Sequence, residues 1–241
     1  MSETLEEIRK LKKAYSPSEE TKARNHGKHV IMMVGPSGTG KSVLTDEVMR
    51  LHPDFQPIAT RTTRPRRPGD PKTFTTANEG FTHEASLDLI QKRMLINFSI
   101  FGTNIYGTTP EDFPLYSIGP ITADSVPALL DGGFSNAVAA FPIVSSETFK
   151  NVLEAERMSF GDISARLEEG IESVDFALTS VGEPWFLPVN NSHELGGLEQ
   201  AAHKVIAFSE GHGEQMATPL AKQALNSMRE VLVSLQSKVN N

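Results

Sequence analysis

The stretch that decides the fold is Gly35-Pro36-Ser37-Gly38-Thr39-Gly40-Lys41-Ser42, which matches the phosphate-loop pattern G-x-x-x-x-G-K-[ST]. A nearly unbroken apolar run, 29–34, precedes it and is typical of a parallel strand buried on both faces. After it, Leu44, Val48 and Leu51 recur at helical spacing. This order of strand, glycine-rich turn and helix directs backbone N–H groups and the positive end of a helix dipole into one concavity. The sequence therefore predicts a site for nucleotide phosphate.

Each residue type of this loop suits that role. Glycine lets the backbone curl around a phosphate without a Cβ clash. We expect Lys41 to bridge the β- and γ-phosphates of ATP, and the Ser42 hydroxyl to bind Mg²⁺. The whole loop, 35–42, is then the expected ATP site, with ATP and Mg²⁺ as the expected donor and cofactor.

Composition predicts one soluble α/β domain with extensions. The chain has 241 residues, 38% hydrophobic and 22% charged, with a net charge of −7 and no cysteine. That length can bury a sizeable core, and the negative charge argues against broad nucleic-acid binding. The absence of cysteine excludes disulfides and thiolate catalysis. Because no signal peptide or membrane-spanning run is evident, we expect a cytoplasmic protein with no membrane partner.

Apolar periodicity predicts alternating strands and helices. Buried strands are expected over 137–144 and 185–190, and helices over 82–95, from Ser146, around 163–174 and over 194–208. Alternation of this kind implies a doubly wound parallel sheet. We expect an N-terminal helix and polar linker over 1–28, a main domain over 29–210 and a C-terminal helix within 211–241.

A second informative segment is Thr60-Arg61-Thr62-Thr63-Arg64-Pro65-Arg66-Arg67-Pro68-Gly69-Asp70. Four arginines in seven residues, held between prolines and a glycine, predict a stiff loop rather than a helix. Arginine forks hold phosphate oxygens bidentately. A solvated basic turn is the alternative, but the position soon after the phosphate-loop helix favours an acceptor site.

The chain resembles the guanylate kinase family. The resemblance rests on GPSGTGKS, TRTTRPRRPGD and FGTNIYGTT in order over about 29–109, with weaker likeness in LEAERMSFGDISARLEEGIES and PVNNS. It implies the P-loop NTPase fold, with a small acceptor-binding insertion at about 60–110 and a helical lid at about 155–166. The activity it implies is transfer of phosphate from ATP to GMP or dGMP.

Carried over to this sequence, the resemblance assigns roles to individual residues. Lys41 and Ser42 bind ATP and Mg²⁺, and Asn190 lies near the adenine. Arg157 and Arg166, from the lid and the helix after it, neutralise the transferring phosphoryl group. Those expected to bind the acceptor are Thr60, Arg64, Arg67, Asn97, Tyr106, Thr108 and Asp124, with Arg64, Arg67 and Tyr106 on its phosphate.

One departure from the family pattern concerns the base. The glutamate that reads guanine in this family has no counterpart, because no Asp or Glu occurs between Asp88 and Glu111, and its position falls on Ile96 or Asn97. The amide of Asn97 would satisfy only part of the guanine edge. Three functions therefore stay open: a GMP kinase, a kinase of another phosphorylated acceptor such as ribose 1,5-bisphosphate, and a non-catalytic protein-binding module.

The terminal helices suggest a partner surface. Apolar residues recur with 3,4 spacing at Leu225, Met228, Leu232, Leu235 and Val239. Two heptads are too few for a stable isolated coiled coil, so we expect the tail to pack on its own domain or on the N-terminal helix. A homodimer through these helices is the alternative hypothesis.

Overall fold

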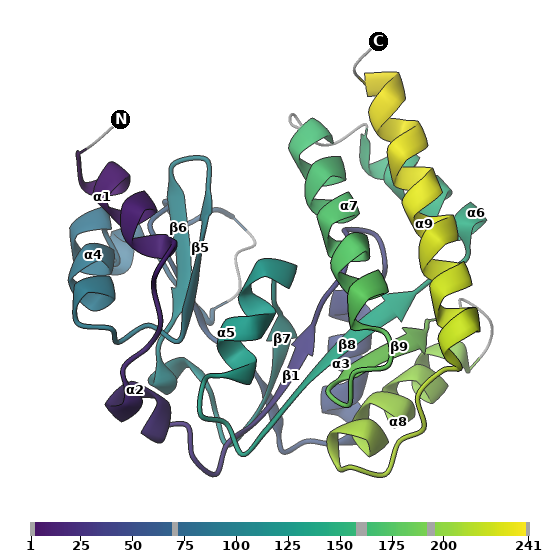
Figure 1. The fold of residues 1–241 in the computed structure, drawn as a ribbon, viewed down its shortest axis with the longest axis horizontal. Helices are drawn as coiled ribbons and strands as arrows, with labels where there is room; N and C mark the ends of the chain where they lie inside the picture. Colours follow the sequence, from purple (N-terminus) through teal and green to yellow (C-terminus); the bar gives the residue numbers. More distant parts are fainter. Residues whose placement is uncertain (1–2, 69–71, 158–162, 192–195, 240–241) are drawn as a thin grey trace. The chain divides into compact units, whose positions relative to one another are not determined.

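The computed structural model describes residues 3–68, 72–157, 163–191 and 196–239 (Figure 1). The chain divides into two compact units, each described by itself. The first contains Met1–Val30, Phe55–Ile118 and Asp124–Ala137, and the second contains Ile31–Asp54, Gly119–Ala123 and Val138–Asn241. Within the described residues, no helix is both long and apolar enough to cross a bilayer.

The α/β class and its parallel strands are confirmed. One sheet has the strand order β2-β7-β1-β8-β9, in which β2 pairs with β7, and β8 with β9, in parallel. These strands are β1 (His29–Met33), β2 (Phe55–Pro57), β7 (Tyr116–Pro120), β8 (Asn136–Ile143) and β9 (Phe186–Asn190). β1 and β8 are almost wholly buried, which agrees with their apolar sequences.

A smaller sheet of order β4-β3-β6-β5 lies in the first unit and is formed by β3 (Thr60–Thr62), β4 (Phe74–Thr75), β5 (Asn97–Phe101) and β6 (Asn104–Thr108). β5, β6 and β3 pair antiparallel, and β3 and β4 pair parallel. Its register sets Asn97 opposite Thr108 and Ser99 opposite Tyr106. Since side chains alternate between the faces of a strand, polar residues share one face of this sheet.

Helices α1 (Glu3–Lys12) and α4 (His83–Gln91) lie side by side in the first unit, as Figure 1 shows. The cluster that joins them to β5 and β6 is fully apolar: Leu5, Ile8, Ile90, Leu95, Phe98 and Ile105. Tyr15 packs edge-on against Phe98 and donates a hydrogen bond to the Leu95 carbonyl at 2.6 Å. Burial raises the pKa of Tyr15 to about 12.

Two boundaries in the first unit differ from the sequence predictions. The helix predicted over 82–95 starts as expected after Thr82, whose hydroxyl caps it, but it ends at Gln91, and Arg93 has a φ of 58°. The segment expected to be a linker contains a short helix, α2 (Glu19–Ala23), capped by Ser18. α5 (Val126–Leu130) completes the unit. Helices of five residues, such as α2 and α5, carry little periodic signal, so the sequence did not predict them.

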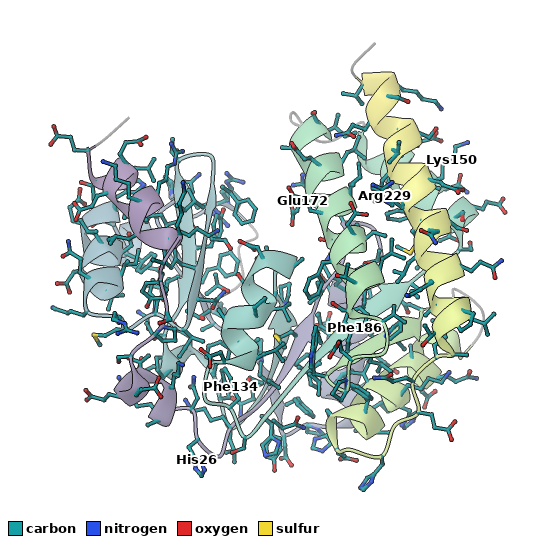
Figure 2. The ribbon with its side chains drawn as sticks, in the orientation of Figure 1. His26, Phe134, Lys150, Glu172, Phe186 and Arg229 are labelled. Atoms are coloured by element: carbon teal, nitrogen blue, oxygen red, sulfur yellow. The ribbon has the colours of Figure 1, made fainter. Side chains whose placement is uncertain are left out.

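The second unit contains α3 (Lys41–Leu51), α6 (Ser146–Arg157), α7 (Ile163–Ser180), α8 (Gly197–Ser209) and α9 (Thr218–Val239). α7 and α9 run side by side along most of their length (Figure 1). Leu225, Met228, Leu232 and Leu235 of α9 are buried, so the tail packs within its own unit. Arg229, labelled in Figure 2, bonds Asp175 of α7 through two N–H groups at 2.5 and 3.3 Å.

Candidate functional site

The phosphate loop lies in the second unit and leads into the N-terminus of α3, which no side chain caps. Gly40 is the residue before α3 and has a left-handed conformation, with a φ of 79°. Neither a capping side chain nor an acidic residue in the first turn occupies the N–H groups of that helix. Ser42 is exposed in this first turn. The helix start therefore offers N–H groups and a hydroxyl to an anion and its metal.

Lys41 already lies against the loop. Its Nζ donates to the carbonyl oxygens of Gly35 and Pro36 at 2.6 and 2.7 Å. The Thr39 hydroxyl donates to the Pro36 carbonyl at 3.0 Å, which closes the loop from inside. The ammonium is thus held at the loop by bonds to neutral carbonyls, which phosphate oxygens can replace with stronger charge-assisted bonds.

Asn191 is a loop contact that the sequence analysis missed. Its Nδ2 donates to the Thr39 carbonyl at 2.9 Å, and its backbone N–H donates to the Ile143 carbonyl at 2.8 Å. The same Nδ2 lies so close to Gly40 that a Cβ there would be 2.5 Å away. The segment PVNNS contained the signal, but the resemblance directed attention to its other asparagine, Asn190, which is exposed at the end of β9.

The two candidate lid arginines are only partly described. Arg157 is the last residue of α6, and its side chain lies outside the described part, as do residues 158–162. Arg166 is exposed in the first turn of α7. Their expected role at the transferring phosphoryl group stays a prediction.

The four arginines of the basic segment have different surroundings. Arg61 forms a two-bond ion pair with Asp112, at 2.7 and 3.0 Å, and Arg66 pairs with Glu79 at 2.8 Å. The pKa of Glu79 is lowered mainly by the hydrogen bond from the Thr76 backbone N–H, and the bond from Arg66 lowers it further. Both of these arginines therefore help to hold the chain in place. Arg67 is exposed, while Asp70 lies outside the described residues.

Arg64 is different, because its side chain is buried, with 6% of the residue exposed. Its Nε donates to the Tyr106 hydroxyl at 3.1 Å and its Nη1 to the Pro65 carbonyl at 3.0 Å. The guanidinium carbon stands 5.4 Å from the ring centre of Phe74, a cation–π contact. The structure thus brings Arg64 and Tyr106 together, as the acceptor assignment requires. Thr60 is half-buried at the start of β3, the strand that precedes Arg64.

Ile96 and Asn97 have different surroundings in the structure. Ile96 is fully buried, and its Cγ2 lies against Gly132. Asn97 stands opposite Thr108, whose hydroxyl donates to its Oδ1. Asn97 is therefore the one of the two that lies on the polar face of the small sheet, and its role in reading a base stays a prediction.

Asp124 joins the same face through Ser99. The Ser99 hydroxyl lies 3.2 and 3.1 Å from the two carboxylate oxygens of Asp124. Lys12, at the end of α1, forms an ion pair with Asp124 at 2.9 Å. Lys12 was not predicted as a site residue, since no motif includes it. Among the described residues there is no group of three or more His, Cys, Asp or Glu side chains that could hold a metal ion.

Comparison with known proteins adds the family. The guanylate kinase family model matches residues 27–138, which include the phosphate loop, the basic segment and the polar face of the small sheet. This part of the chain is similar to the guanylate kinase family. A guanylate kinase of Synechococcus sp. (strain JA-3-3Ab) is 35% identical over 83 residues, and one of Thermobifida fusca (strain YX) is 32% identical over 96 residues.

These matches to guanylate kinases are partial. They cover 34% and 39% of this chain and 37% and 47% of the two relatives, so the chain spans less than half of the curated relatives it matches. A crystal structure of guanylate kinase from Anaplasma phagocytophilum aligns with 79% of this chain and 88% of its own, at 16% identity and a TM-score of 0.46. Helices α1 and α2, and α6 to α9, lie outside the region that the family model matches.

Proposed function

We propose that this protein is an ATP-dependent phosphotransferase of the guanylate kinase type, which converts GMP or dGMP to its diphosphate with release of ADP. The observation that carries the proposal is the buried Arg64 bonded to Tyr106. Many nucleotide-binding proteins contain a phosphate loop, whereas a buried arginine beside a tyrosine hydroxyl suits a second phosphate, that of the acceptor. Arg67 and Thr60 would add to this subsite.

On the donor side, Lys41 and the N–H groups of the loop would hold the phosphates of ATP. Phosphate oxygens would replace the Gly35 and Pro36 carbonyls as partners of Lys41, and Asn190 would lie near the adenine. The open first turn of α3 fits Mg²⁺, with the Ser42 hydroxyl as its protein ligand. Bound Mg²⁺ would neutralise charge on the phosphates.

The reaction needs position and charge more than a protein nucleophile. An oxygen of the acceptor phosphate attacks the γ-phosphorus of ATP, and the bond to the β–γ bridging oxygen breaks as ADP leaves with the electron pair. Arg64 would orient the attacking phosphate, while Lys41, Arg157 and Arg166 would neutralise the developing charge. The chain then requires no catalytic base.

The test is ADP release from ATP-Mg²⁺ with GMP, dGMP, AMP, CMP, UMP and ribose 1,5-bisphosphate. We expect turnover with GMP and dGMP, and we expect Lys41→Ala to abolish it because the charge at the loop is lost. Circular dichroism should show that the variant is folded. Turnover of ribose 1,5-bisphosphate alone would re-assign the acceptor, and ATP binding without any turnover would support a binding module instead. Unchanged turnover in Lys41→Ala would mean that the loop is not the donor site.

Two further proposals rest on sequence composition alone. They are a cytoplasmic location and the lack of a nucleic-acid partner, and both stay predictions. The homodimer hypothesis concerns the terminal helices and is tested by the mass in solution, as discussed below.

A further inference from the structure

The helix that precedes the family-matched region is built into the acceptor-binding unit. Leu5 and Ile8 of α1 are 2% and 0% exposed and pack against the apolar face of β5 and β6. Arg9 Nη2 donates to the Gly102 carbonyl at 3.0 Å, in the turn between those two strands. Because these contacts fix the helix on two sides, the position of its last residue, Lys12, is also fixed.

Lys12 reaches the polar face of the same sheet. Its Nζ lies 2.9 Å from Asp124 Oδ2, and that carboxylate is bonded to Ser99 of β5. Ser99 stands opposite Tyr106 and two residues from Asn97 on the same face. Residues two apart on a strand are separated by roughly 7 Å. A planar base held against Asn97 is therefore within reach of the Lys12–Asp124 pair.

The chemistry of this face differs from that of a face with a single glutamate. Asn97 has one acceptor oxygen, and Thr108 already donates to it. Guanine presents one acceptor, its 6-oxo oxygen, beside two donors, its N1–H and 2-amino group. An ammonium and a carboxylate side by side offer both a donor and an acceptor. The Lys12–Asp124 pair can therefore supply a donor for the 6-oxo oxygen and a carboxylate acceptor, and the Asn97 amide has no carboxylate.

We propose that Lys12 is a specificity-determining residue of the acceptor site, which donates a hydrogen bond to the 6-oxo group of a purine monophosphate while its ion pair orients Asp124. The inference rests on the proposed function and deepens it. A 6-oxopurine is bound in preference to a 6-aminopurine, because an amino group in the same place would turn its hydrogens toward the ammonium.

The experiment compares the full-length wild-type chain with Lys12→Met and Lys12→Arg, and Lys13→Ala is the matched control, since Lys13 is exposed one residue further on. Turnover of GMP, IMP and AMP is measured at saturating ATP-Mg²⁺. If one of them is not phosphorylated, its affinity is measured as the inhibition constant in competition with GMP. IMP retains the 6-oxo group without the 2-amine, and AMP replaces the oxo group.

In Lys12→Met we expect kcat/KM for both GMP and IMP to fall about tenfold, the loss of one hydrogen bond to a charged group. AMP affinity and the KM for ATP should stay as in the wild type, Lys12→Arg should recover part of the loss, and Lys13→Ala should show none. The Lys12–Asp124 pair is partly exposed, with 37% and 50% of the side chains accessible, so the melting temperature should change little.

Two results would overturn the inference without touching the proposed function. The first is that Lys12→Met leaves the preference for GMP over AMP unchanged, as measured by kcat/KM or by the inhibition constant. The second is that all acceptors lose kcat/KM equally while the KM for ATP rises, which would indicate a structural role. A wild-type protein that binds ATP but does not phosphorylate GMP would instead overturn the proposed function, and this inference with it.

Discussion

Gly40 is the residue at which the phosphate loop becomes a helix. Its φ of 79° lies in the left-handed region, and Asn191 occupies the space that a side chain would need. Gly196 provides a matched comparison, because it precedes α8 with the same φ of 79°, and among the residues that the structure describes no atom lies within 4 Å of an added Cβ. The two glycines thus share the backbone strain and differ in the contact.

We expect Gly196→Ala to lower the free energy of unfolding by about 1 kcal/mol, the cost of the left-handed conformation alone. Gly40→Ala should lower it by about 1–3 kcal/mol more, since the new methyl group displaces Asn191 and its bond to the Thr39 carbonyl. Urea unfolding measures both, and calorimetry should show weaker ATP binding for Gly40→Ala only. Equal effects of the two substitutions would contradict the proposed role of Asn191.

Three arginines of the basic segment, Arg61, Arg64 and Arg66, show how similar residues acquire different roles. Arg61 and Arg66 pair with carboxylates of their own unit, whereas the buried Arg64 contacts a hydroxyl and a ring. Composition alone cannot separate them, because each has the same fork of donors. Their partners come from Asp112, Glu79 and Tyr106, which folding brings to the segment.

At the scale of elements, α7 and α9 form a helix pair held by close packing. Gly170 of α7 lets Leu232 of α9 approach, since a Cβ there would stand 3.0 Å from the Leu232 side chain and 3.5 Å from that of Pro36 in the phosphate loop. Leu232 is fully buried. The C-terminal helix therefore packs where α7 passes the loop, and the contact at this point is apolar.

We expect Leu232→Ala to lower the free energy of unfolding by about 2–5 kcal/mol, because it removes buried methyl groups and leaves a cavity. Leu220, on the same helix, is 60% exposed, and Leu220→Ala should change stability by no more than about 0.5 kcal/mol. Thermal and urea unfolding measure the difference. If the two variants were equally stable, α9 would not be packed as the structure has it.

At the scale of the whole molecule, the exposed apolar side chains bear on whether the protein forms a dimer. The α9 stripe that suggests a dimer is buried within its own unit. The large exposed apolar side chains of the described residues are few and far apart in the sequence: Val43, Phe101, Leu115, Leu220 and Val233. Single exposed apolar residues are normal on a monomer. We therefore expect a mass near 26.3 kDa by light scattering at micromolar concentration. A mass twice as large would support a dimer through the terminal helices.

The sequence by itself determined the elements whose signal is local. The apolar run 29–34, the loop 35–42 and the periodic helix after it predict strand, turn and α3, because each depends on residues adjacent along the chain. The resemblance to guanylate kinases likewise rests on three short segments in order. The strands β3 to β6 were harder to predict, since they are short and partly polar.

Only the tertiary structure decided which residues meet. The register places Asn97 rather than Ile96 opposite Thr108, packing brings Lys12 to Asp124, and the end of β9 brings Asn191 to Gly40. The last two pairs join residues more than a hundred positions apart. Periodicity cannot specify such contacts, because they depend on how elements pack and how strands align, and a shift of one residue would turn each side chain to the opposite face.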